Sequence, residues 1–244
     1  MVNAIVKKEE SVLEQVTGIC LQKELAYRIE EKDYWAIKGK QYALCQEAEQ
    51  KSDERKIIDT YIIMKENTKE IFYIRYYKKE KVAYLQKKQI SNRGSYEISV
   101  PLTKKEYKSI RNKNISWMKN SDEALVLEFY AKCNLFSWDL GIKVEYKREK
   151  INVPQNYGEL YIYSNIVVKR DNKEMEQYIN ELGTILELKY QHELSIELRN
   201  MLQTRKEIAL YWYEDYNQRK KSGFGIAGIS GMLYNMFVNT PALA

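Results

Sequence analysis

Residues 70–77 read EIFYIRYY and residues 82–90 read VAYLQKKQI, and the polar tetrapeptide KKEK separates these two runs. Successive side chains of a strand point to opposite faces, so the first run places Tyr73 and Arg75 on the same side. Two alternating runs around a short polar turn are typical of an antiparallel β-hairpin. One face of this hairpin combines tyrosine with charge, which is unusual for a strand whose other face is aliphatic.

Similar patterns recur on both sides of the hairpin. They predict further strands over residues 23–29, 94–102, 142–152, 159–170 and 183–191. Apolar residues at helical spacing, together with capping residues such as Thr103 and Glu106, predict helices over residues 2–20, 30–50, 103–110, 120–136, 171–182 and 193–221. Antiparallel strands with helices at their ends and outside indicate an α+β fold.

The mixed faces of these strands leave two architectures open. Residues that share such a face are Tyr84, Gln86 and Lys88 in one segment, Val144, Tyr146 and Arg148 in a second, and Ile185, Glu187 and Lys189 in a third. An open sheet or sandwich would turn this face to solvent. A closed barrel would instead enclose it and could hold a charged ligand inside.

Composition excludes several kinds of site. The chain has 244 residues, and its 40 basic and 34 acidic residues give a net charge of +6. The single histidine, His192, excludes a histidine-clustered metal site, and Cys20, Cys45 and Cys133 are too widely spaced to suggest a zinc knuckle. The start does not read as a signal peptide and no apolar run is long enough for a standard spanning helix, so we expect a cytoplasmic protein. The lysine-rich stretches are interleaved with acidic residues, so we expect a solvated surface and no nucleic-acid partner.

Short motifs in a characteristic order link the chain to a known family. They are KELAY at 23–27, YIRYY at 73–77, LQKK at 85–88, VEYKRE at 144–149 and LELKY at 186–190. In this order they resemble the VTC domain, of the polyphosphate polymerase type, in the CYTH-like superfamily of triphosphate tunnel metalloenzymes. The resemblance runs from about residue 23 to residue 216 and implies an antiparallel β-tunnel of about eight strands with helices outside.

The resemblance also implies a site and an activity. Proteins of this family hold a triphosphate or polyphosphate with basic residues and a divalent metal with acidic ones, and the VTC branch makes polyphosphate from ATP. The matching basic residues, expected to act on the phosphates, are Arg75, Lys88, Arg148 and Lys189. Glu24 and Glu187 would hold Mg²⁺ or Mn²⁺, and Tyr27, Lys87 and Tyr146 would contact the ligand. The alternative for Glu24 and Glu187 is that each pairs with a neighbouring inward lysine or arginine.

Several ionic positions of the family pattern are replaced in this chain. The replacements are Ala26, Tyr73, Gln86, Glu97, Glu159 and Tyr163. We therefore expect a diverged member that binds a polyphosphate, a nucleoside triphosphate or a less charged ligand, with reduced or lost phosphoryl transfer. The alternative function is a non-catalytic scaffold or assembly protein that reuses the tunnel fold.

The last 23 residues differ from the rest of the chain. Residues 222–244 contain no charged side chain and four of the ten glycines, among many apolar residues. We interpret residues 1–221 as the tunnel domain and residues 222–244 as a tail. The tail could dock on a partner or on another subunit, associate peripherally with a membrane, or remain disordered.

Overall fold

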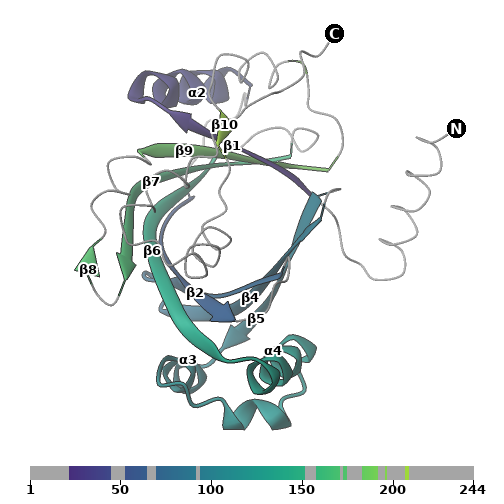
Figure 1. Ribbon diagram of the computed structural model, residues 1–244. Coiled ribbons are helices and arrows are strands. Elements are labelled where there is room, and N and C mark those ends of the chain that lie inside the picture. The colour runs from purple at the N-terminus through teal and green to yellow at the C-terminus, as the bar shows by residue number, and fades with distance from the viewer. Residues whose placement is uncertain are drawn as a thin grey trace, which may run out of the picture.

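The computed structural model describes residues 22–44, 53–64, 70–91, 94–151, 158–170, 173–174, 183–191, 196 and 207–208. One antiparallel sheet dominates this part of the chain (Figure 1). Its strands are β1 Lys23–Ile29, β2 Asp53–Met64, β3 Glu70–Tyr77, β4 Val82–Ser91, β5 Gly94–Leu102, β6 Trp138–Ile151, β7 Glu159–Arg170, β8 Lys173–Glu174, β9 Thr184–Tyr190 and β10 Glu207–Ile208. The order across the sheet is β10-β1-β9-β7-β6-β2-β3-β4-β5, with β8 paired to β7.

The sheet curls so far that its two ends approach each other, as Figure 1 shows. Gln22, just before β1, and Ser95 of β5 exchange two backbone hydrogen bonds of 2.8 and 2.7 Å. Gly94 makes this approach possible: its φ is +145°, and a Cβ there would lie 2.7 Å from the Gln22 carbonyl oxygen. The curl encloses the mixed tyrosine-and-charge face, so the expected α+β antiparallel tunnel is confirmed and the open, solvated sheet is not.

Helices cover the outside of the curl at two places. Helix α2 (Glu31–Leu44) lies near β1 and β9, where Ile37 packs with Tyr27, Leu186 and Leu188 in an outer apolar cluster. Helices α3 (Lys104–Arg111) and α4 (Ala124–Leu135), joined through the 3₁₀ turn η1 (Ser116–Asn120), lie under β2 to β5. The core beneath them is centred on the fully buried Phe129.

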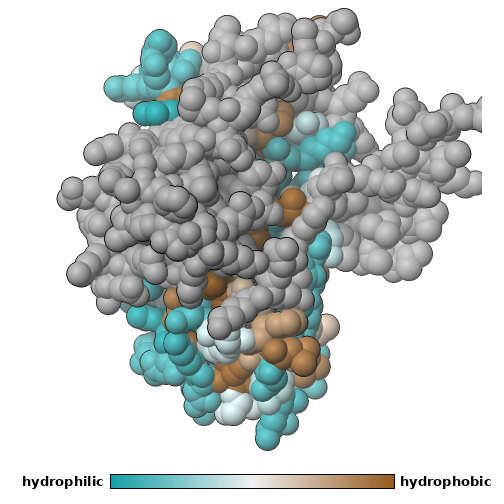
Figure 2. Space-filling view, in the orientation of Figure 1, coloured by the Kyte–Doolittle hydropathy of each residue, from teal (hydrophilic) through white to brown (hydrophobic). Residues whose placement is uncertain are grey.

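The chemistry of the helix ends agrees with the sequence prediction for α3. Thr103 accepts a hydrogen bond from the backbone N–H of Glu106, and the Glu106 side chain accepts one from the backbone N–H of Thr103. This capping box satisfies two N–H groups that the first turn would otherwise leave unpaired. Figure 2 shows hydrophobic residues among hydrophilic ones at the end of the molecule that carries α3 and α4, and Leu127 and Leu135 of α4 are exposed.

Strand β2 was not predicted from the sequence, although it lies at the centre of the sheet. Its run KIIDTYIIM lacks a clean alternation because both faces of the strand are buried. Ile57 packs inside the curl with Val144, whereas Ile62 packs on the outside in the core around Phe129. Strand β6 also begins earlier than predicted, at Trp138.

Two helix predictions are corrected where the structure describes them. Residues 173–174, predicted to be helical, form strand β8 opposite Lys169 and Arg170 of β7. Asp171 favours turns as well as helix N-caps, which explains the misreading. Residues 207–208, inside the helix predicted over 193–221, form β10 and pair with Ala26 and Tyr27.

Other predictions fall outside the described residues. These are the helix over 2–20, most of those over 171–182 and 193–221, and the tail at 222–244. In the part of the chain that the structure describes, no helix combines the length and the apolar character needed to cross a membrane.

Candidate functional site

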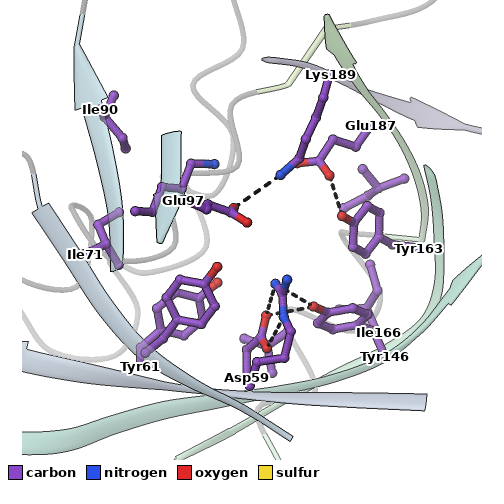
Figure 3. A pocket seen from close by; sticks show the side chains of 15 residues that line it. Asp59, Tyr61, Ile71, Ile90, Glu97, Tyr146, Tyr163, Ile166, Glu187 and Lys189 are labelled. Atoms are coloured by element: carbon purple, nitrogen blue, oxygen red, sulfur yellow. Dashed lines mark hydrogen bonds and ion pairs between the residues drawn. The ribbon is translucent and has the colours of Figure 1, made fainter. Parts of the chain in front are cut away.

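A polar pocket of about 80 Å³ lies inside the curled sheet (Figure 3). This volume is enough for several water molecules. Its lining comes from seven strands, β2 to β7 and β9. The fifteen lining residues are Asp59, Tyr61, Ile71, Tyr73, Arg75, Lys88, Ile90, Glu97, Val144, Tyr146, Tyr163, Ile166, Ile185, Glu187 and Lys189.

A buried ion pair forms one wall of the pocket. The Arg75 guanidinium donates from Nε to Oδ1 of Asp59 at 2.9 Å and from a terminal nitrogen to Oδ2 at 2.8 Å. The hydroxyl of Tyr146 donates to Oδ2 of Asp59 at 2.7 Å and lies 3.2 Å from the same terminal nitrogen of Arg75. Burial alone would lower the pKa of Arg75, but the Asp59 carboxylate outweighs burial and raises it. Arg75 is therefore charged and already engaged by a carboxylate.

A second group of charges bridges the two ends of the curl. Lys189 of β9 pairs with Glu97 of β5 at 3.2 Å and with Glu24 of β1 at 3.4 Å, and Lys88 of β4 pairs with Glu24. Figure 3 shows Glu97 and Lys189 reaching toward each other across the pocket. These ion pairs connect β4 and β5 to β1 and β9. The described backbone hydrogen bonds between these two ends of the sheet are those between Gln22 and Ser95.

The pKa values in this group reflect the pairing. Burial would raise the pKa of Glu97, but the charges of Lys189, Arg75 and Lys88 outweigh it and lower the pKa to about 2. The pKa of Glu24 is lowered in the same way, by Lys88 and Lys189 acting against burial. Burial would lower the pKa of Lys189, yet its carboxylate neighbours raise it well above the usual value. All these groups are ionised at neutral pH.

Tyrosines complete the pocket wall. The Tyr163 hydroxyl donates to the buried carboxylate of Glu187 (Figure 3). Burial raises the pKa of Tyr163 well above its usual value, so this hydroxyl keeps its proton and remains a donor. Tyr61 and Tyr73 stack with ring centroids 5.5 Å apart, and the Arg75 guanidinium lies 5.2 Å from the centre of the Tyr73 ring.

The structure brings most of the predicted site residues together. Arg75, Lys88, Tyr146, Glu187 and Lys189 line the pocket. Glu24 reaches the same group of charges through its ion pairs with two lysines. Among the replaced family positions, Tyr73, Glu97 and Tyr163 also line it.

Arg148 follows Tyr146 by two residues on the same face of β6. Its guanidinium lies 4.9 Å from the centre of the Tyr161 ring and 3.5 Å from the Tyr77 hydroxyl. Within the described ranges it makes no ion pair with a carboxylate, in contrast to Arg75, Lys88 and Lys189. Of the four predicted phosphate-binding cations, Arg148 is therefore the one that a phosphate could reach without displacing a described carboxylate.

Tyr27 and Lys87 are not brought to the pocket, because each lies one residue out of phase with the inward face. Tyr27 packs in the outer cluster beside Ile37 of α2. Lys87 lies on the outer face of β4 and donates to both carboxylate oxygens of Glu128 in α4, at 2.8 and 2.7 Å. In this structure both side chains contribute to packing between the sheet and the helices.

Sequence reasoning missed Asp59 and Tyr61, because it missed the strand that carries them. The signal was present in the β-branched run around Asp59, where a single acid interrupts isoleucine and threonine residues. An acidic residue within such a run needs a buried partner. The arginine directly opposite, Arg75, is that partner.

The described carboxylates do not fit a divalent metal. Both oxygens of Glu24 face lysine ammonium groups, and Glu187 accepts a hydrogen bond from Tyr163. Across the described ranges, no group of three or more His, Cys, Asp or Glu side chains is arranged to hold a metal ion. In the described residues Glu24 therefore forms internal ion pairs, which is the alternative that the sequence left open.

The charges that line the pocket are balanced. Three basic side chains, Arg75, Lys88 and Lys189, face three acidic ones, Asp59, Glu97 and Glu187. A binding site for a highly charged anion normally presents an excess of positive charge. A ligand in this pocket must exchange existing ion pairs for new ones.

Comparison with known proteins bears on the fold. The sequence matches no protein-family model, and no curated protein matches it either. A candidate adenylate cyclase from Bacillus halodurans has a similar structure, with a TM-score of 0.52 and 13% identity over 77% of this chain and 91% of that one. This likeness shows that the two chains share a tunnel-like α+β fold.

More distant similarities occur as well. A candidate adenylate cyclase from Vibrio parahaemolyticus has a TM-score of 0.40 at 11% identity, over 75% of this chain and 83% of that one. The RNA triphosphatase domain of a mimivirus mRNA capping enzyme has a TM-score of 0.39 at 11% identity, over 81% of this chain and 95% of that one.

Proposed function

We propose that this chain is a diverged tunnel domain that binds an anion of the triphosphate or polyphosphate class in its central pocket and does not transfer phosphoryl groups. The observation that carries this proposal is the convergence of Arg75, Lys88 and Lys189, from three different strands, on one pocket inside the curled sheet. Arg148 extends the same inward face beyond the pocket lining, and its guanidinium contacts the side chains of Tyr77 and Tyr161. Charge-assisted hydrogen bonds from such groups are the strongest that a protein offers to phosphate oxygens.

Loss of phosphoryl transfer follows from the carboxylates. A phosphotransferase of the metal-dependent kind needs acidic side chains that are free to coordinate the ion beside the phosphates. Here Asp59 is held by Arg75, Glu24 by two lysines and Glu187 by Tyr163. These carboxylates stabilise the tunnel instead, so we expect binding without turnover and without Mg²⁺ or Mn²⁺.

Thermal unfolding with and without tripolyphosphate tests the binding proposal. A ligand at 100 times its Kd stabilises the folded state by about 2.7 kcal/mol. We therefore expect the Tm to rise by several degrees, and Arg148→Ala to abolish the rise. Lys147→Ala, which alters the adjacent residue that pairs with Glu54 instead, is the matched control and should preserve the rise. No shift at millimolar concentrations of either tripolyphosphate or orthophosphate would reject the proposal.

The proposed loss of phosphoryl transfer is tested by two assays, each with and without Mn²⁺. One measures phosphate release from ATP, and the other measures polyphosphate synthesis. We expect neither reaction to exceed the rate in buffer. Turnover that depends on Mn²⁺ would show that the carboxylates rearrange to hold a metal, and would contradict the proposed loss of activity.

The balanced pocket supports a second candidate function. If the ion pairs never open, the charged interior only holds the tunnel together, and the chain serves as a scaffold or assembly protein. The uncharged segment at 222–244, which lies outside the described residues, would then dock on a partner, a membrane protein or another copy. Deleting it and measuring particle mass by light scattering tests this candidate: an unchanged mass and unchanged membrane partition would reject it.

A further inference from the structure

Glu97 lies where it can compete with a ligand. It belongs to β5, its side chain reaches into the pocket, and its carboxylate pairs with Lys189 at 3.2 Å (Figure 3). A carboxylate oxygen and a phosphate oxygen both accept hydrogen bonds from an ammonium group, so Glu97 and a ligand phosphate would compete for Lys189.

The other two acidic side chains of the pocket, Asp59 and Glu187, have different hydrogen-bond partners. Asp59 is closed off by two hydrogen bonds from Arg75 and one from Tyr146. Glu187 is buried and held by the Tyr163 hydroxyl. Within the described ranges, the one ion pair of Glu97 is that with Lys189, and about a quarter of its side chain is exposed. Glu97 is thus a pocket acid that is held by one ion pair and whose side chain is partly exposed.

A ligand phosphate that reaches Lys189 must either displace Glu97 or bind beside it. A terminal phosphate carries about −1.5 to −2 charges and each further phosphate of a chain adds roughly one more, so the repulsion grows with the number of phosphates that enter the pocket. Lys189 retains Glu24 as a partner, at 3.4 Å, after Glu97 moves away.

We propose that Glu97 is a specificity-determining residue that acts as an internal anion on Lys189 and lowers the affinity of the pocket for long, highly charged phosphates relative to short ones. This inference rests on the proposed function, because it concerns the choice among phosphate anions in the same pocket. Orthophosphate or a single phosphoryl group replaces Glu97 on Lys189 with little repulsion, whereas tripolyphosphate brings additional charge against Glu97 and Glu187.

Calorimetric titration of orthophosphate and tripolyphosphate into the wild-type protein and Glu97→Gln tests the inference. We expect the variant to bind tripolyphosphate at least 10-fold more tightly than the wild type, and orthophosphate with a smaller gain. Glu54→Gln is the matched control, because Glu54 also pairs with a lysine, at 3.0 Å from Lys147, but is half exposed outside the pocket. It should change neither affinity.

Two outcomes separate the two proposals. If Glu97→Gln leaves the preference between the two anions unchanged, the role of Glu97 is wrong while anion binding stands. If neither the wild type nor the variant binds either anion, the proposed function fails and this inference fails with it. If circular dichroism shows that Glu97→Gln does not fold, Glu97→Thr removes the same charge with a residue that favours strands. The affinities of Glu97→Thr for the two anions are then compared with those of the wild type.

Discussion

Arg75 and Asp59 lie directly opposite each other on β3 and β2, and the guanidinium donates to both oxygens of the carboxylate, at 2.9 and 2.8 Å. Only 2% of Asp59 is exposed, so the pair is almost completely removed from water. Asp59→Asn would leave the Arg75 charge buried without compensation and should destabilise the fold by about 3–5 kcal/mol. Urea denaturation measures this loss.

A double replacement serves as its control. Asp59→Leu with Arg75→Met removes both charges and should recover most of the stability lost in Asp59→Asn, since two apolar side chains need no partner. A loss below about 1 kcal/mol in Asp59→Asn alone would mean that water or another group compensates Arg75, and that this wall of the pocket is more open than described.

Acid should weaken the contact between Glu97 and Lys189. The pKa of Glu97 is lowered from 4.5 to about 2 in the folded chain, because its cationic neighbours outweigh burial. The stabilisation is therefore complete above about pH 4.5 and is lost as the pH falls toward 2. With solvent screening of its partly exposed side chain, Glu97 should contribute roughly 1–2 kcal/mol.

The measurement is the free energy of unfolding from pH 6 to pH 2 for the wild type and for Glu97→Gln. The difference between the two should shrink as the pH falls through this window, because the glutamine has no proton to gain. Parallel curves would contradict the assigned ion pair.

Two adjacent lysines on β4 test the direction in which this strand faces. Lys88 lines the pocket, whereas Lys87 pairs with Glu128 of α4 on the outside. Lys88→Met should abolish the thermal shift produced by a phosphate anion. Lys87→Met should keep the shift and lower the stability by about 1 kcal/mol, by removing an ion pair with a partly exposed partner. The reverse pattern would place β4 one residue out of register.

The join between the two ends of the curl depends on a single glycine. Gly94 has a φ of +145°, and a Cβ there would lie 2.7 Å from the carbonyl oxygen of Gln22. Gly94→Ala should therefore break the pair of backbone hydrogen bonds between Gln22 and Ser95. Amide hydrogen exchange at Ser95 should become markedly faster, while exchange at Leu85, inside β4 between β3 and β5, should not change.

Much of the curl could be predicted because alternation is a local property of the chain. Strand β1 has the predicted bounds at 23–29, β7 those at 159–170, and the inward positions of Arg75 and Lys189 were predicted as well. The capping box at Thr103 also follows from local chemistry, and it begins α3 as predicted.

What could not be predicted depends on contacts between distant residues. Strand β2 is buried on both faces, so it loses the alternation that marks a strand, and Asp59 was missed with it. Whether Glu24 binds a metal or a lysine depends on which residues face it across the join, and the sequence does not show that Lys88 does. Tyr27 and Lys87 were expected to contact the ligand, but both side chains lie on the outer face of the sheet. The matching of short motifs does not distinguish the two faces of a strand.

The central claim is that a phosphate-type anion binds between Lys88, Lys189 and Arg75 inside the curl. Crystals soaked in tungstate, a tetrahedral oxyanion with a strong anomalous signal, test it most directly. The account predicts an anomalous peak inside the pocket, close to the Lys189 ammonium, that disappears in Lys189→Met crystals. Peaks confined to the outer surface at the same tungstate concentration would contradict it, and would leave the ion pairs as the internal supports of a scaffold.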